Sequence, residues 1–227
     1  MVTMNPVAIR LLNQQLVAPK FSDPAEVVGY LGAIQAQEYR LMRWAVAMRT
    51  KKPSMKASYA LTANKVKSTV KMNRDEALMR FTRKYFQSRQ PATLEDFVWW
   101  SGLNVSDCRK GIALLGDTIH VEHWKGRDFY LTDDCRTRGF RKGQFLLIPP
   151  YDEYLIGYKS RDIVLLPEHR HHAHNNSGIF QPIIAHDGII CGNWSPFKED
   201  CQVEFFEGDY GVEDVQEAWQ IYIKCRQ

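Results

Sequence analysis

The sequence predicts an α+β fold in which a winged helix is followed by a mainly β domain that ends in a helix. Between residues 74 and 131, three helix-like segments are followed by a β-hairpin, which is the size and order of a winged helix. From residue 145 onward the apolar pattern changes to strand-like runs, and an amphipathic segment closes the chain.

Two helices are expected ahead of this region. Asn5 and Pro6 suit the N-cap and first helical position of one, and apolar residues return at helical spacing after Pro24 in the other. The periodicity then fades between residues 50 and 71, which favours a boundary there. We therefore expect three parts: a helical segment (1–55), a winged helix (56–135) and a β domain (136–227).

Apolar spacing marks the first helix of the predicted winged helix, and capping residues mark the second and third. The first is expected over residues 74–87, the second after Thr93 with Asp96 in a capping box, and the third from the turn at Asn104 to residue 115. A hairpin, 119–122 with 128–131, turns at residues 125–127 and forms the wing.

The β domain is predicted from three strand-like runs. Asp187–Gly188 is a hairpin turn signal between the runs 179–186 and 188–193, and a third run covers 202–206. A final helix, from residue 212 to about residue 224, presents one apolar side and is expected to cover one face of the sheet.

Composition excludes several classes of protein. Lys and Arg number 30 against 26 Asp and Glu, a net charge of +4, which permits an anionic partner but is far from a histone-like excess. Five cysteines without a C-x-x-C pair predict neither a disulfide framework nor a zinc ribbon. No stretch approaches the roughly 18 apolar residues of a membrane span. A cytoplasmic protein, nucleoid-associated in a bacterium, is expected.

Four stretches resemble one known family, the winged-helix DNA-binding proteins of the AlkZ/YcaQ DNA glycosylase group. They are LGAIQAQEY (31–39), PATLEDFVWWSGL (91–103), YDEYLIGYK (151–159) and GIFQP (178–182). The resemblance implies a C-terminal β-barrel-like domain and DNA repair as the function. It also implies an internal deletion, because Met48–Arg49 runs within a few residues into Ala60–Leu61–Thr62. An engineered deletion, a natural truncation or a gene-model error would each give this sequence.

Gln35 and Gln37 look like the family's catalytic Gln-x-Gln motif. The resemblance implies a monofunctional glycosylase that hydrolyses the N-glycosidic bond of N7-alkylated or crosslinked purines without a metal or organic cofactor. A carboxamide can position water but is no strong base near neutral pH, so cationic lesions, whose glycosidic bond is already weak, are the expected substrates. Side chains two residues apart on a continuing helix point about 200 degrees apart. Both amides can therefore reach one site only if the helix ends near Gln35 and the chain becomes extended or turns. Ordinary helix-end glutamines are the alternative.

Ten cations are predicted to contact double-stranded DNA. Some lie on the third helix and wing, some in the following connection, and two after the YDEY stretch; they are Arg109, Lys110, Lys125, Arg127, Arg136, Arg138, Arg141, Lys142, Lys159 and Arg161. A solvated surface or an ordinary linker would look similar.

Two other clusters are not expected to carry chemistry. Histidines at 169, 171, 172 and 174 invite a metal site, but a surface loop is the expectation. Asp152 and Glu153 resemble an acid–base pair, but neighbours on a strand point to opposite sides.

The alternative to an enzyme is a non-catalytic DNA-binding regulator or interaction module.

Overall fold

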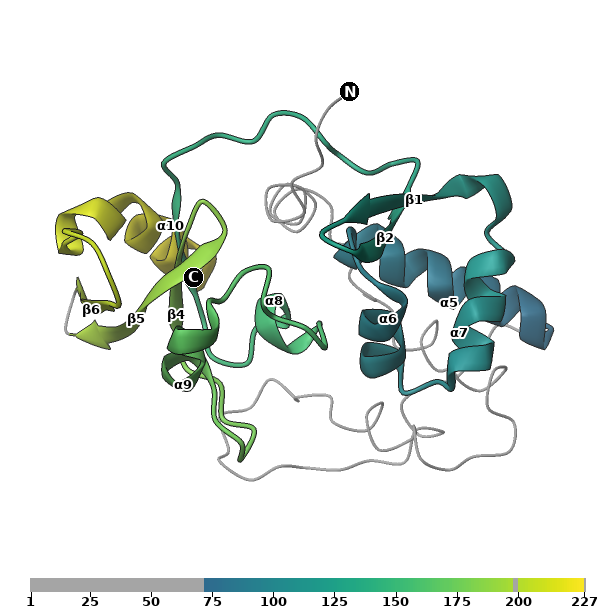
Figure 1. The fold of residues 1–227 in the computed structure, drawn as a ribbon. Helices are drawn as coiled ribbons and strands as arrows, with labels where there is room; N and C mark the ends of the chain where they lie inside the picture. Colours follow the sequence, from purple (N-terminus) through teal and green to yellow (C-terminus); the bar gives the residue numbers. More distant parts are fainter. Residues whose placement is uncertain (1–71, 198–199, 227) are drawn as a thin grey trace, which may run out of the picture.

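The computed structural model describes residues 72–197 and 200–226, which form helices together with two antiparallel sheets (Figure 1). The N-terminal part of this region holds α5 (Arg74–Arg89), α6 (Leu94–Ser101), α7 (Val105–Ala113), the 3-10 turn η1 (Gly116–Thr118), and the hairpin β1 (Ile119–Trp124) and β2 (Arg127–Thr132). The three helices and the hairpin therefore follow in the predicted order.

The helices begin where the sequence predicts. Asn73, Thr93 and Asn104 cap them with their side chains, and Thr93 and Asp96 form the expected capping box. Phe81, Tyr85, Phe86 and Phe97 are buried in one cluster. The core between the helices is therefore largely aromatic, with Tyr85 and Phe97 ring centroids 4.7 Å apart.

The hairpin turn is one residue shorter than predicted. Lys125 and Gly126 have φ values of 48° and 74°, which fits a two-residue turn of the type that matches the strand twist. Arg127 is paired with Trp124 and begins β2, so the tip of the hairpin consists of Lys125 and Gly126.

The second half of the described chain is built on an open sheet of order β3-β4-β5-β6. Its strands are β3 (Phe145–Ile148), β4 (Ile183–His186), β5 (Ile189–Phe197) and β6 (Asp200–Phe205), and three short helical segments, α8 (Glu153–Ile156), η2 (Pro167–His169) and α9 (Arg170–Ala173), lie between β3 and β4. The turn η3 (Val212–Val215) leads into α10 (Gln216–Arg226).

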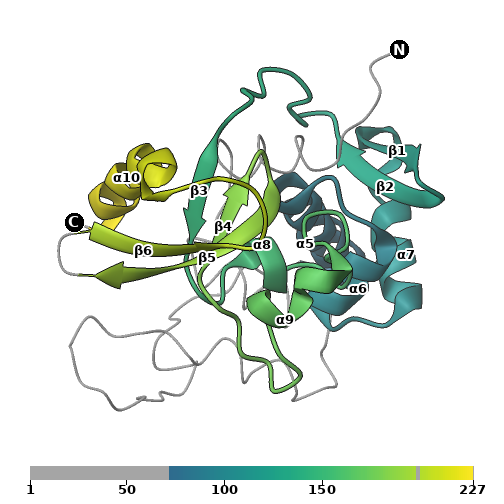
Figure 2. The ribbon, with the colours of Figure 1, turned by 60° about the vertical axis from the view of Figure 1, so that its left-hand side comes forward.

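The expected barrel is wrong for the described residues, since β3 and β6 stay unpaired at the two edges and the sheet does not close. Helices instead cover both faces (Figure 2). Leu147, Ile184 and Trp194 pack with residues of α10, whereas Ile148 and Ile183 pack on the opposite face with the segment that contains α8 and α9. Alternate residues along β3 and β4 thus belong to hydrophobic cores on opposite faces of the sheet.

Three local predictions are also corrected. The run 179–186 is a strand only from Ile183, because Pro182 has no N–H to donate to a ladder. The YDEY stretch, treated as a strand, is the short helix α8 with Asp152 as its N-cap, and the histidine run, expected as a loop, contains α9. The turn at Asp187 and Gly188 is confirmed, with φ values of 50° and 85°.

None of the helices in the described part is long and apolar enough to cross a membrane.

Candidate nucleic-acid interface

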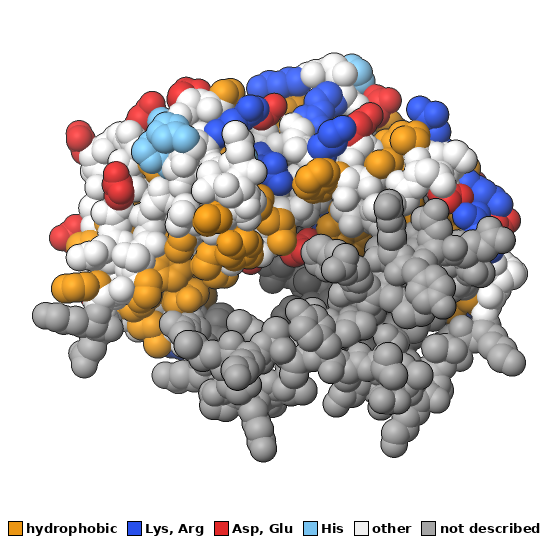
Figure 3. Space-filling model, turned by 90° about the horizontal axis from the view of Figure 1, so that it is seen from below, with side chains coloured by type: hydrophobic (Ala, Val, Ile, Leu, Met, Phe, Trp, Pro, Cys, Tyr) orange, Lys and Arg blue, Asp and Glu red, His pale blue; other side chains and the backbone are white. Residues whose placement is uncertain are grey.

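A cleft of about 820 Å³ lies where the hairpin, the start of α6 and the segment after α8 meet. Four parts of the chain, α7, β2, the segment after α8 and α9, bring five cations to its wall, and three carboxylates accompany them. The cations are Arg109, Arg127, Lys159, Arg161 and Arg170, and the carboxylates are Glu95, Asp128 and Asp162. Figure 3 shows Lys and Arg side chains gathered on one face of the described part, with acidic side chains beside them. The wall therefore carries more positive than negative charge.

Asp96 fixes the backbone of one side of the cleft. Its carboxylate is fully buried, and one oxygen accepts hydrogen bonds from the Thr93 N–H at 3.0 Å and the Thr93 hydroxyl at 2.9 Å. The other oxygen accepts from the backbone N–H groups of Lys159 at 2.9 Å and Ser160 at 3.4 Å. The residue that caps α6 thus also holds the segment that carries Lys159 and Arg161.

Neutral groups position two guanidiniums of the cleft, those of Arg127 and Arg161. Arg127 donates to the Ser160 hydroxyl at 3.1 Å and lies over the Phe129 ring. Arg161 donates through Nε to the Leu155 carbonyl at 2.8 Å and lies 5.2 Å from the centre of the Phe180 ring. Neither forms an ion pair with a carboxylate within residues 72–197 and 200–226. Two partly desolvated cations without such pairs make the cleft suited to an anion.

The cleft also perturbs the groups that titrate in it. Burial lowers the pKa of the Arg161 guanidinium, with the nearby Arg170 contributing in the same direction and Asp96 opposing it. Burial, together with the charges of Arg161 and Arg170, lowers the pKa of His174. The neutral imidazole of His174 is favoured because the ring is partly buried and because its proton would join a cluster of cations.

An anion in the cleft should therefore raise the pKa of His174. A short DNA duplex would offset the charges of Arg161 and Arg170, so protonation becomes easier and binding takes up a proton. Affinity should accordingly increase as pH falls through the range between the pKa values of the free and bound forms. NMR titration of the imidazole signals with and without duplex measures the shift. His186, which stacks on Phe145 outside the cleft, is the control; an unchanged His174 at saturation would contradict binding here.

The carboxylates of the cleft are partly engaged. Asp162 forms an ion pair with Arg170, and Asp128 lies 3.0 Å from Nδ1 of His123. Both pairs are exposed, so solvent screens them strongly. These carboxylates reduce the positive charge of the cleft, but the five cations on its wall still favour the binding of an anion.

Four of the ten predicted DNA-binding cations lie in the cleft: Arg109, Arg127, Lys159 and Arg161. Lys110 does not, because its ammonium pairs with Asp75 of α5 at 2.5 Å. Lys125 lies over the Trp124 ring at the tip of the β1–β2 hairpin. The remaining four are exposed on the connection between β2 and β3 and do not line the cleft; they are Arg136, Arg138, Arg141 and Lys142.

Arg170, His123 and His174 line the cleft but were not predicted. The signal for two of them was present, since the run 169–174 contains an arginine and four histidines without an acid. A run so rich in histidine suggests a metal site before it suggests an anion site. No group of three metal-ligating side chains is found in the described residues, and His172 instead stacks on Phe206, with ring centroids 4.5 Å apart.

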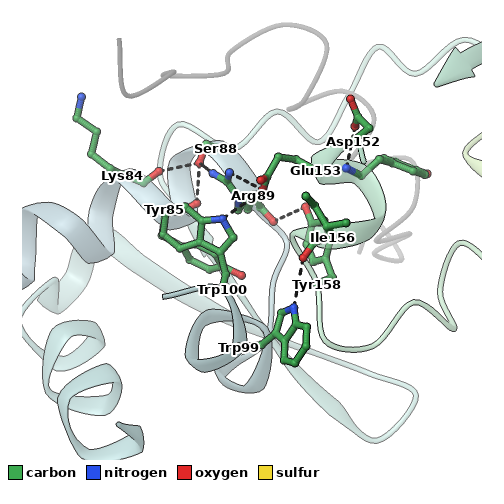
Figure 4. A network of polar contacts seen from close by, with 11 residues as sticks. Lys84, Tyr85, Ser88, Arg89, Trp99, Trp100, Asp152, Glu153, Ile156 and Tyr158 are labelled. Atoms are coloured by element: carbon green, nitrogen blue, oxygen red, sulfur yellow. Dashed lines mark hydrogen bonds and ion pairs between the residues drawn. The ribbon is translucent and has the colours of Figure 1, made fainter. Parts of the chain in front are cut away.

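Glu153 ties the segment after β3 to the helices (Figure 4). Its Oε2 accepts from Nε and a terminal nitrogen of Arg89, at 3.1 and 2.7 Å, and from the Trp100 indole at 3.2 Å. On the other side of α8, the Tyr154 hydroxyl donates to the Gly188 carbonyl at 2.5 Å. Helix α8 thus bridges the helical part and the sheet.

Asp152 has a separate role. It caps α8 by accepting from the Tyr154 N–H at 2.8 Å, and burial, with the neighbouring Glu153 charge, raises its pKa. The two acidic side chains have different partners, so the described contacts show a cap and an ion pair. Gln35 and Gln37 lie outside the described residues, and their catalytic role stays a prediction.

Comparison with known proteins gives three matches. The sequence profile of the family described as DNA glycosylase AlkZ-like matches residues 35–205. An interstrand DNA cross-link repair glycosylase from Streptomyces sahachiroi is 30% identical over 144 residues, which cover 58% of this chain and 38% of that protein. The solved structure of the Streptomyces sahachiroi DNA glycosylase AlkZ matches with a TM-score of 0.64 at 24% identity, covering 74% of this chain and 48% of the other. The chain thus spans less than half the length of each relative.

Proposed function

Because the chain belongs to the AlkZ-like DNA glycosylase family, we propose that it binds duplex DNA in the cationic cleft and releases damaged bases from it. The observation that carries the binding proposal is the convergence of Arg109, Arg127, Lys159 and Arg161 from separate elements. Phosphate contacts from such side chains supply most of the affinity for a duplex and position it.

We propose that α5 to α7 and the β1–β2 hairpin act as a winged helix, within a domain that spans residues 56–135. Arg109 of α7 and Arg127 of β2 line the same cleft, so helix and wing would face one DNA molecule. The remaining domains of this proposal are 1–55, with Gln35 and Gln37, and 136–227, with the open sheet.

The proposed reaction is hydrolysis of the N-glycosidic bond of an N7-alkylated or crosslinked purine. The alkylated base already carries positive charge and is a good leaving group, so the protein has to position water and stabilise an oxocarbenium-like transition state. Gln35 and Gln37 are the proposed positioning groups, because a carboxamide orients water without titrating. The family match begins at Gln35 and includes both residues, and a relative acts on interstrand cross-links by name.

Base release tests the enzymatic part. The chain should release N7-methylguanine from a duplex, and Gln35→Ala or Gln37→Ala should each reduce the rate by about a hundredfold or more, as expected for loss of a group that stabilises the transition state. Gln202→Ala, at an exposed glutamine of β6, is the matched control. Tight duplex binding without release by any version would instead identify a non-catalytic DNA-binding protein, which is the alternative function for a chain that spans less than half of its relatives.

A further inference from the structure

An apolar groove adjoins the cationic cleft at the outer side of α6. It has a volume of about 570 Å³ and is lined by the side chains of Val98, Trp99, Leu103 and Val105. Arg109 and Lys159 line both the groove and the cleft. In Figure 3, hydrophobic side chains lie directly beside the gathered Lys and Arg side chains. A ligand in the groove would therefore be continuous with an anion in the cleft.

Trp99 presents most of the exposed aromatic surface at this groove. Trp99 is 54% exposed, the largest value among the exposed large hydrophobic residues of α5 to α7 and the β1–β2 hairpin. The neighbouring Trp100 packs in the cluster of Figure 4, where its indole donates to Glu153 and the Arg89 guanidinium lies 4.4 Å from its ring centre. Of the two adjacent tryptophans, Trp100 is thus covered by its neighbours and Trp99 leaves most of its ring exposed.

The exposed indole is held in a fixed orientation. Its Nε1 donates to the Ile156 carbonyl at 3.2 Å, at the end of α8 (Figure 4). A ring anchored at its polar edge loses little side-chain entropy when another ring packs against it. Isolated exposed tryptophans need no explanation, but this one is anchored, lines a groove and lies beside two cations.

We propose that Trp99 stacks on an unpaired nucleobase of the DNA strand whose phosphates contact Arg109 and Lys159. The inference rests on the proposed DNA binding in the cleft. A base within a duplex has both faces covered by its neighbours, whereas an unpaired base offers a face to an aromatic ring, and aromatic stacking beside a cationic groove is the common mode of single-strand recognition. Glu95, which lines both the groove and the cleft, can accept a hydrogen bond from an exocyclic amino group.

The test compares two duplexes of the same sequence, one fully paired and one with a single bulged nucleotide at its centre. The full chain should bind the bulged duplex more tightly than the paired one. In Trp99→Ala the ratio of the two affinities should fall roughly tenfold, as expected for the loss of one stacked base. Trp99→Phe, which keeps a ring but loses the bond to Ile156, should retain part of it. With 2-aminopurine at the bulge, stacking on the indole should quench its fluorescence in the wild-type complex and not in Trp99→Ala.

Ile221→Ala, at an exposed apolar residue of α10 away from the groove, is the matched control, and thermal unfolding checks that the variants fold. Equal affinity of the wild type for both duplexes would overturn the role of Trp99 while leaving DNA binding intact. An equal loss on both duplexes in Trp99→Ala would also overturn it, because a general contact then explains the effect. Absence of binding to either duplex would contradict the proposed function itself.

Discussion

A chain with Arg127→Gln and Lys159→Gln together should bind duplex DNA roughly fiftyfold more weakly than the wild type at about 0.1 M salt, since each lost phosphate contact removes about 0.9 from the slope of log affinity against log salt. The two cations come from β2 and from the segment after α8, and both line the cleft. Glutamine is shorter than either cation but stays polar, so the variant loses the two charges and their phosphate contacts without adding apolar surface to the cleft.

The salt dependence distinguishes this prediction from a general loss of folding. The slope should fall by about 2 in the double variant, and the affinities should converge with the wild type as salt is raised. Arg80→Gln with Lys110→Gln is the matched control, because it removes the same charge from cations that pair with Glu76 and Asp75 outside the cleft. A slope that changes equally in both double variants would show that net charge, and not the cleft, determines the affinity.

The helices and the hairpin were predictable because their signals are local. Asn73, Thr93 and Asn104 are side-chain caps that act within three residues, and the apolar spacing after each one follows the helical period. The turn at Asp187 and Gly188 is equally local. The error over the YDEY stretch has a physical cause, since α8 is only one turn long and is stabilised by distant partners, Arg89 and Gly188, which no sequence period reveals.

The cleft was predictable only in part. Basic side chains are visible in the sequence, but whether each is available depends on tertiary contacts. Lys110 and Arg109 are neighbours on α7, yet the first pairs with Asp75 and the second lines the cleft. Likewise the resemblance supplied Gln35 and Gln37, whereas the residues and their spacing alone favour ordinary helix-end or surface glutamines.

Asp96→Asn should lower the free energy of unfolding by about 3 kcal/mol, because it leaves buried donors facing an amide nitrogen in place of a carboxylate oxygen. Asparagine has the same shape, but only one of its two terminal atoms can accept. One Asp96 oxygen serves the Thr93 N–H and hydroxyl, and the other serves the Lys159 N–H. Either orientation of the amide therefore leaves at least one donor without its acceptor.

Urea unfolding followed by circular dichroism measures this effect, with Asp75→Asn as the control. Asp75 is half-exposed and paired with Lys110, and removal of such a surface ion pair should cost at most about 1 kcal/mol. A loss for Asp96→Asn no greater than for Asp75→Asn would contradict the dual role assigned to Asp96. A large loss is the result expected if the carboxylate that caps α6 also stabilises the Lys159–Ser160 backbone. The start of α6 and the backbone that carries Lys159 would then depend on one buried side chain, so this side of the cleft is built before any DNA binds.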